Sequence, residues 1–278
     1  MAKGSVPKRR LDAELVRRKI ARSREHASEL IKNGLVTVNG MAATKPATAV
    51  TGDVSIRVAD DADDGNWASR GAHKLLGALE AFEPQGLSIK GRRVIDAGAS
   101  TGGFTDVCLR REAAEVIAVD VGYGQLIWRL RDDDRVRVLD RTNVRTLTPE
   151  AIGGPADVMV GDLSFISLRL VLPALAECLV DGADLLPMVK PQFEVGKERL
   201  GSGGVVRSPE LRAEVVGDVA RAARDLGLSV RGVVASPLPG PSGNVEYFLW
   251  LVKDGGAGDV GSDKLDAMIA EAVEEGPQ

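Results

Sequence analysis

Residues 94 to 105, Val-Ile-Asp-Ala-Gly-Ala-Ser-Thr-Gly-Gly-Phe-Thr, decide the fold of this chain. An apolar run ends at Asp96, and three glycines then surround a short polar tract. In α/β proteins, a strand that turns through glycines into a helix brings the backbone close to a nucleotide-like ligand. The stretch therefore predicts a Rossmann-like α/β domain with a ligand at the carboxyl end of this strand.

The spacing of the glycines indicates which ligand the loop takes. A dinucleotide fingerprint needs G-x-G-x-x-G, but Ser100 stands where the second glycine would approach a pyrophosphate. The loop suits a nucleoside without phosphates, in particular S-adenosylmethionine; the alternative is a glycine-rich turn without a ligand. Asp120 ends the next apolar run 24 residues after Asp96, where an acid accepts hydrogen bonds from ribose hydroxyls. The expected cofactor-binding residues are Asp96, Gly98, Ala99, Ser100, Thr101, Gly102, Gly103, Asp120 and Asp140.

Strand and helix patterns alternate from about residue 70 onward, which predicts a largely parallel, seven-stranded sheet with helices on both faces. Because ligands bind beyond the carboxyl ends of such strands, Asp96, Asp120, Asp140, Asp162 and Lys190 are expected at one edge. A helical pattern spans Leu211–Leu226. The expected strands are Arg93–Asp96, Val116–Asp120, Val136–Leu139, Asp157–Gly161, Asp184–Val189, Ser229–Ala235 and Glu246–Val252.

The amino-terminal region is basic, whereas the rest of the chain is acidic. Residues 1–52 carry 11 Lys/Arg and 4 Asp/Glu, and the remaining residues carry 25 and 36. A basic segment on an acidic body points to nucleic acid. The expected phosphate contacts are Arg9, Arg10, Arg17, Arg18 and Arg24; the alternative for Arg17 and Arg18 is a solvated helix face.

Hydrophobic patterns show that this basic region folds. A helix over Arg10–Ile20 is expected to bury Leu11, Leu15, Val16 and Ile20, and Ser23 is expected to cap a second helix that buries Ala27, Leu30 and Ile31. Val36–Val38 runs into Asn39-Gly40, a hairpin signal, and Val54, Ile56 and Val58 alternate as a strand. These patterns predict a small α+β RNA-binding domain over residues 1–59. The acidic stretch 60–68 is expected to be a linker, 69–254 the α/β domain, and 255–278 a tail with a possible short helix.

Composition narrows the class of protein. Hydrophobic residues make up 44% and charged residues 27%, which is typical of soluble globular proteins. No apolar run approaches the roughly 20 residues of a membrane span, and the amino terminus lacks a signal-peptide core. Cys108 and Cys178 form no disulfide or metal pattern and are expected to be buried; two histidines are too few for a metal site. We expect a cytoplasmic protein without a metal or a membrane partner.

Several segments resemble the TlyA (hemolysin A) family of ribosomal RNA 2′-O-methyltransferases over nearly the whole length. The first 58 residues are similar to the RNA-binding module named after ribosomal small-subunit protein four, and the rest to the FtsJ-like methyltransferase fold. In the first part the similarity lies in Arg9-Arg-Leu-Asp12, Ser23-Arg24 and Val36-x-Val-Asn-Gly40. In the second part it lies in Ser69-Arg-Gly-Ala-His-Lys-Leu75, Asp162-Leu-Ser-Phe-Ile-Ser167, Met188-Val-Lys-Pro-Gln-Phe-Glu194 and Gly243-Asn-Val-Glu-Tyr247.

The resemblance implies an activity and a set of catalytic residues. Lys74, Asp162, Lys190 and Glu246 match the Lys-Asp-Lys-Glu tetrad of ribose methyltransferases. The cofactor would be S-adenosylmethionine, and the partners would be ribosomal RNA and the ribosomal subunits. The long basic amino terminus resembles the form of the family associated with cytidines of both subunits. The linker departs from this pattern, since Gly65-Asn-Trp-Ala68 keeps the tryptophan of an Arg-x-Trp-Val-like tetrapeptide but loses its arginine.

The chemistry of ribose methylation agrees with this tetrad. A 2′-hydroxyl is a poor nucleophile at neutral pH, so an enzyme must align it and remove its proton. A free lysine, with a pKa of about 10.4, is almost fully protonated at pH 7, but a nearby cation and partial burial favour the neutral amine. We therefore expect Lys74 to supply that cation to Lys190, the predicted general base, while Asp162 and Glu246 orient the amines.

Three alternatives remain at this point. The tetrad residues could form two purely structural ion pairs. The protein could be an RNA-binding ribosome-assembly factor with a vestigial methyltransferase domain, although the intact glycine loop and complete tetrad favour an enzyme. It could also be a cytolysin, as the name hemolysin records, although no pore-forming segment is evident in the sequence.

Overall fold

The computed structural model describes residues 8–18, 20–21, 23–32, 34–52, 54–58, 67–196 and 198–277. The chain divides into two compact units, Met1–Asn66 and Trp67–Gln278. Each unit has its own strands and its own core. Most of the expected linker, residues 60–66, lies outside the described residues, whereas Trp67 and Ala68 are part of the second unit.

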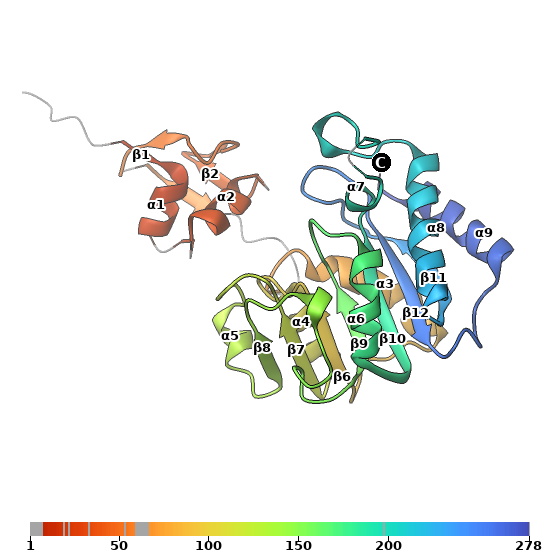
Figure 1. Ribbon diagram of the computed structural model, residues 1–278. Coiled ribbons are helices and arrows are strands. Elements are labelled where there is room, and N and C mark those ends of the chain that lie inside the picture. The colour runs from red at the N-terminus through yellow and green to blue at the C-terminus, as the bar shows by residue number, and fades with distance from the viewer. Residues whose placement is uncertain are drawn as a thin grey trace, which may run out of the picture. The chain divides into compact units, whose positions relative to one another are not determined.

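The first unit packs two helices against short strands (Figure 1). Its core joins Leu11 and Leu15 to Ala27, Ile31 and Val36, with Val16 and Leu30 partly buried against it, so the predicted helical faces are buried except at Ile20. The Asn39-Gly40 hairpin turn is confirmed by the pairing of strands β2 and β3 around it. Strand order in its larger sheet is β3-β2-β5, and β1 pairs with β4. The elements are β1 (Arg9–Arg10), α1 (Leu11–Arg17), α2 (Arg24–Lys32), β2 (Val36–Val38), β3 (Met41–Ala42), β4 (Ala49–Val50) and β5 (Ile56–Val58).

Helix α1 is shorter than predicted. It ends at Arg17, and the expected core residue Ile20 is 36% exposed. The backbone N–H groups of Ile20 and Ala21 both bond to the carbonyl of Leu15, which turns the chain out of the helix. Ala21, which is buried, therefore takes the place in the core that the helical pattern assigned to Ile20.

Two buried carboxylates on α1 hold the arginines around them. Asp12 accepts hydrogen bonds from Arg10 at 2.8 Å and Arg24 at 3.1 Å. Glu14 accepts from Arg17 at 2.6 Å and Arg18 at 2.8 Å. Hydrogen bonds from Arg10 and from Arg17, respectively, lower the pKa of Asp12 and of Glu14 from 3.8 and 4.5 to about 2.

These lowered pKa values predict how the stability of the basic unit depends on pH. The unfolded chain binds protons at Asp12 and Glu14 more tightly than the folded chain, so their contribution is complete above about pH 4.5. It is lost as the pH falls from there toward 2. Chemical denaturation at pH 7, 4 and 3 should show this loss, and Asp12→Asn together with Glu14→Gln should flatten it. An equally steep acid limb in the double variant would contradict the assignment.

The second unit is a seven-stranded sheet in the order β11-β12-β10-β9-β6-β7-β8. Neighbours from β10 to β8 are parallel, and β12 runs antiparallel to both β10 and β11. This confirms the predicted α/β class and largely parallel sheet. The strands are β6 (Arg93–Ala97), β7 (Glu115–Val119), β8 (Val136–Leu139), β9 (Ala156–Gly161), β10 (Leu179–Val189), β11 (Leu228–Ala235) and β12 (Tyr247–Lys253).

Two features of the topology place the site. The strand order reverses between β6 and β9, and a reversal of this kind opens a crevice beyond the carboxyl ends of the strands. Because β12 runs the opposite way, its beginning lies at that same edge. Val189, which precedes Lys190, pairs with Tyr247, which follows Glu246.

Helices cover both faces of the sheet (Figure 1). Successive strand side chains point to opposite faces, and both sets are apolar, so each face forms a core with its helices. Ile95 and Ile117 face the core formed with α6, α8 and α9, whereas Val94 and Val116 face the core formed with α3, α4 and α5. Both cysteines are buried in these cores, as predicted. The helices are α3 (Ala72–Phe82), α4 (Gly103–Arg110), α5 (Trp128–Arg131), α6 (Leu172–Glu177), α7 (Pro191–Glu194), α8 (Pro209–Asp225) and α9 (Ser262–Glu275).

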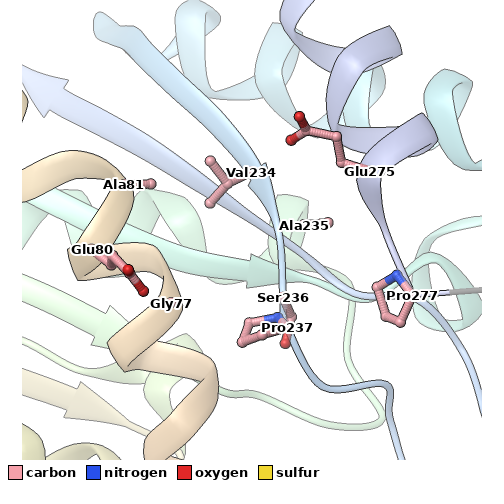
Figure 2. A pocket seen from close by; sticks show the side chains of 9 residues that line it. All are labelled: Gly77, Glu80, Ala81, Val234, Ala235, Ser236, Pro237, Glu275 and Pro277. Atoms are coloured by element: carbon pink, nitrogen blue, oxygen red, sulfur yellow. The ribbon is translucent and has the colours of Figure 1, made fainter.

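The carboxyl-terminal segment is not the tail that the sequence suggested. Helix α9 has 14 residues and buries Leu265, Ile269 and Ala272 in the core. The glycine- and aspartate-rich stretch before it is held by Asp259, which accepts from Arg224 and from the backbone N–H of Val230. Because of this burial and these hydrogen bonds, the segment is an integral layer of the α/β unit. A groove of about 440 Å³ lies between α3 and the ends of β11 and α9 (Figure 2).

Candidate active site

The glycine loop after β6 is shaped by contacts within the protein. Gly98 has φ +88°, and a side chain there would meet the backbone oxygen of Asp162 at 2.8 Å. Gly103 begins α4, and a Cβ atom there would lie 2.4 Å from Ser69 Oγ. Glycine is therefore required at position 98 because the loop after β6 touches the loop after β9 there. The sequence instead suggested that glycine leaves space for the ligand.

Asp96 is a completely buried acid at the end of β6. Its Oδ2 accepts a 2.6 Å hydrogen bond from Thr105, and its Oδ1 has no hydrogen-bond partner. Burial raises the pKa of Asp96 to about 7; the hydrogen bond from Thr105 only partly offsets this, and the charge of Asp162 adds to it. A buried acceptor without a donor is costly, which favours a ligand that brings a donor or a positive charge.

The two other predicted acids lie after β7 and β8 and differ in their surroundings. Asp120 accepts hydrogen bonds from the backbone N–H groups of Ser100 (2.8 Å) and Gly122 (2.7 Å), so it ties the glycine loop to the next strand. Asp140 instead forms an ion pair with Arg131 at 2.6 Å. A ligand that used Asp140 would have to compete with this arginine.

Four charged side chains meet at the carboxyl edge of the sheet. Lys74 Nζ on α3 lies 2.6 Å from Glu246 Oε2 and 3.9 Å from Asp162 Oδ2. Lys190 Nζ lies 2.5 Å from Asp162 Oδ1 and donates to Ser164 Oγ at 2.8 Å. Asp162 thus bridges two lysines that are each less than 10% exposed, and Glu246 is completely buried. The structure brings together all four residues of the predicted tetrad.

A cavity of about 930 Å³ opens beside this cluster. Phe165 at its wall is 90% exposed and has φ +64°, a conformation that is strained for a bulky side chain. Its ring lies 5.1 Å from that of Phe193. The lining residues are Arg145, Ser164, Phe165, Ile166, Ser167, Leu170, Lys190, Gln192, Phe193, Gly196, Leu200, Gly204, Pro241, Ser242, Asn244 and Glu246.

Glu194 and Gln192 lie at or near this cavity, and no role was predicted for either of them. Glu194 is buried and accepts from Ser167 Oγ (2.6 Å) and from the backbone N–H of Leu168 (2.7 Å), which ties the loop after β9 to α7. Gln192 donates to Glu246 at 3.4 Å. Both lie in the segment Met188–Glu194, which resembles the family. Their contacts with other loops depend on tertiary structure and could not be predicted from the sequence. Among the described residues, no group of three or more His, Cys, Asp or Glu could hold a metal ion.

The predicted RNA-binding arginines fall into two groups. The side chains of Arg9, Arg10, Arg17 and Arg24 are about half exposed while they contact Asp12 or Glu14. Arg18 is only 22% exposed and also donates to the carbonyls of Val54 and Gly52. Arg18 therefore fastens α1 to the carbonyls of Gly52 and Val54, and each of its three guanidinium nitrogens donates within the unit. The alternative prediction, that Arg18 lies on a solvated helix face, is also not met, because its side chain is only 22% exposed.

Comparison with known proteins decides the family. Residues 67–253 match the model of the FtsJ-like methyltransferases, and residues 9–56 match the S4 domain. The chain is an FtsJ-like methyltransferase. A 16S/23S rRNA (cytidine-2′-O)-methyltransferase TlyA of Mycobacterium tuberculosis is 58% identical over 96% of this chain and 98% of its own length. The predicted membership of the TlyA (hemolysin A) family is therefore confirmed.

Two further relatives carry the other name of this methyltransferase family. Hemolysin A of Brachyspira hyodysenteriae is 33% identical over 87% of this chain and 99% of its own. A solved structure from Streptococcus thermophilus, described as a candidate hemolysin, is 38% identical, covers 98% of both chains and has a TM-score of 0.75. In the ranges that the structure describes, no helix is long and apolar enough to cross a membrane.

Proposed function

We propose that this protein methylates the ribose 2′-hydroxyl of cytidines in ribosomal RNA with S-adenosylmethionine as methyl donor. The observation that carries the proposal is the bridged lysine pair, Lys74 and Lys190 on Asp162, with Lys190 at the wall of a cavity of about 930 Å³. Support comes from the FtsJ-like family and from the name of the Mycobacterium tuberculosis relative. The S4 domain supports RNA as the substrate class.

The glycine loop and the acids at its ends fit the cofactor. S-adenosylmethionine, when bound, supplies a methyl group that its sulfonium has already activated. The unpartnered Oδ1 of Asp96 would accept from the cationic amino acid portion, and Asp120 would accept from ribose hydroxyls. The backbone from Gly98 to Gly103 would line the adenosyl portion, and Asp140 is proposed at the far end of the site.

Lys190 is proposed as the proton acceptor. Its Nζ is held by Asp162 and Ser164 at the cavity wall, and it acts after it has released its own proton to solvent. With both lysines protonated, the two ammonium and two carboxylate groups carry no net charge. Once Lys190 has lost its proton the cluster is negative, and the proton taken from the 2′-hydroxyl makes it neutral again. Lys74, fixed by Glu246 at 2.6 Å, stays charged and keeps Asp162 in place. The residues orient a weak nucleophile and remove its proton, which are the two tasks of this chemistry.

The aromatic pair at the cavity is proposed to position the target base. Phe165 presents an almost fully exposed ring beside Phe193, and Glu194 holds the loop on which Phe165 lies. Stacking of a base on an aromatic ring contributes about 1–3 kcal/mol and tolerates any base. A nucleotide taken out of its RNA stack would place its ribose next to Lys190.

The raised pKa of Asp96 predicts that the affinity for the cofactor depends on pH. Because its pKa is raised to about 7, the ionised form that attracts a cationic ligand predominates only above that pH. Affinity for S-adenosylmethionine should therefore rise between pH 6 and 8. Calorimetric titrations at three pH values test this, with Asp96→Asn expected to bind more weakly and independently of pH. A pH-independent affinity in the unaltered protein would remove Asp96 from the cofactor site.

The proposed function is tested by mapping 2′-O-methyl groups on ribosomal RNA from cells with and without the protein. We expect methylated cytidines that disappear with the gene and return with the unaltered protein. Rescue by a Lys190→Ala protein would favour the alternative of an assembly factor without catalysis. Separate mapping of both subunits decides whether the altered Gly65-Asn-Trp-Ala68 segment narrows the substrate range. Leakage of liposomes at neutral pH would support the cytolysin alternative.

A further inference from the structure

Arg212 is a buried cation that forms no direct ion pair among the described residues. It lies in the first turns of α8, is 7% exposed, and its Nε has no hydrogen-bond partner. Across the described ranges of the chain, no carboxylate lies within 4.0 Å of its guanidinium. The neighbouring Glu210 accepts from Ser208 Oγ at 2.6 Å; this hydrogen bond and, to a smaller extent, the charge of Arg212 lower the pKa of Glu210. A buried charge of this kind is costly unless an anion compensates it.

Tyr247 adds a second unsatisfied donor beside Arg212. Its hydroxyl is buried and has no aligned hydrogen-bond partner. Burial raises the pKa of Tyr247, and the charge of Arg212 together with a hydrogen bond from its guanidinium partly offsets this rise. The Nε–H of Arg212 and the O–H of Tyr247 therefore lack an acceptor among the described residues, and such buried donors usually have one.

A pocket of about 320 Å³ lies in front of Arg212. Its described lining includes two arginines, 207 and 212, the hydroxyl of Ser242 and no acidic residue. The walls are fixed, because Asn244 accepts from the backbone N–H of Val206 and donates to the carbonyl of Gly204, both at 2.9 Å. The amino terminus of the 17-residue helix α8 adds positive potential at the same place. The full lining is Val205, Val206, Arg207, Arg212, Ser242, Gly243, Val245 and Pro277.

We infer that this pocket binds a phosphate group on the guanidinium of Arg212. Planar guanidinium donors and a helix amino terminus match the oxygens of phosphate. Ser242 lines this pocket and the cavity beside Lys190, so the phosphate would sit behind the loop that leads to Glu246. It would come either from free inorganic phosphate or from the RNA backbone near the target nucleotide. Only the RNA source rests on the proposed function.

The site is tested by calorimetric titration of inorganic phosphate into the full chain. Arg212→Met should weaken or abolish one saturable binding event, by about 10- to 100-fold in affinity, since hydrogen bonds to charged groups contribute that much. Arg221→Met is the matched control, because Arg221 lies on the same helix but is paired with Asp218 on the exposed face. Sites on the basic unit are common to all variants and therefore cancel in the comparison.

Thermal unfolding without phosphate separates binding from a purely structural role. Arg212→Met should melt at the same temperature or higher, because it removes a buried charge that forms no direct ion pair. Phosphate should raise the midpoint of the unaltered protein but not that of the variant. If Arg212→Met does not fold, Val205→Asp provides a second route, since its carboxylate would occupy the pocket and also exclude phosphate. Equal phosphate binding with and without the pocket substitution would overturn the inference.

An RNA-binding experiment distinguishes the two sources. If the phosphate belongs to RNA, Arg212→Met should reduce the slope of log affinity against log salt by about 1, and inorganic phosphate should compete with RNA. If the ligand is free phosphate, the slope stays the same while the calorimetric difference persists. Absence of both effects would overturn the site. Loss of methylation in cells, by contrast, bears only on the proposed function.

Discussion

A Lys190→Ala enzyme is expected to lose methylation activity by about 10²–10⁴-fold, the usual contribution of a general base. Affinity for S-adenosylmethionine and for RNA should remain nearly unchanged, because the proposed role of Lys190 is limited to the transition state. The side chain is buried at the cavity wall and contacts Asp162 and Ser164. Single-turnover methylation of ribosomal RNA, together with calorimetric binding of the cofactor, measures both quantities.

Two companion variants sharpen this prediction. Lys190→Arg keeps a positive charge beside Asp162 but cannot release its proton, so it should be nearly as inactive as Lys190→Ala. Lys90→Ala removes an exposed lysine that is paired with Glu112 on the same unit and should be fully active. Activity of Lys190→Ala within a few-fold of the unaltered enzyme would show that Lys190 only forms an ion pair.

Six of the seven strands have apolar runs that end in polar residues at one edge of the sheet, and β12 begins at that edge after Glu246; these patterns make the strands predictable. The largest discrepancy is β10, which begins at Leu179 and not at Asp184. Asp181-Gly182 resembles a turn, but the strand continues through a register shift between Leu179 and Asp184. A bulge of this kind depends on pairing with β9, which no local pattern reveals.

Two predictions differ from the structure for a related reason: the tail with a possible short helix at 255–278, and the burial of Ile20. The helical pattern after Gly261 buries Leu265 and Ile269 only because β11 and α8 offer a surface for them. The pattern in α1 continues to Ile20, yet the helix ends at Arg17. In both cases tertiary packing outweighs local periodicity.

The tetrad could be predicted from strand ends and from the family pattern, whereas its surroundings could not. Asp162 and Lys190 follow parallel strands, so their nearness follows from topology. Glu246 lies at the same edge only because β12 is antiparallel. The contacts of Phe165, Gln192 and Glu194 depend on how two loops fold against each other, and the engagement of Arg18 with carbonyls is equally invisible in a charge count.

A chain that begins at Trp67 is expected to fold and bind S-adenosylmethionine but to lose methylation of ribosomal RNA. The cut is placed before Trp67 because Arg110 stacks over its ring at 3.9 Å and the N–H of Ala68 donates to Asp106 at 2.8 Å. Both residues therefore belong to the α/β unit, which keeps its whole sheet. Residues 67–278 carry 24 Lys/Arg and 31 Asp/Glu, a net charge of −7 that repels phosphates.

The shortened chain should fail through substrate affinity and not through chemistry. Its cofactor affinity and thermal midpoint should match those of the α/β unit in the full chain, while RNA binding at physiological salt should fall below detection. In the full chain, Arg17→Ala should lower the salt dependence of RNA binding by about one unit of slope, because its guanidinium is half exposed. Arg18→Ala should instead lower the stability of the basic unit, because Arg18 bonds to Glu14, Val54 and Gly52. Normal methylation by the shortened chain would place RNA recognition on the α/β unit.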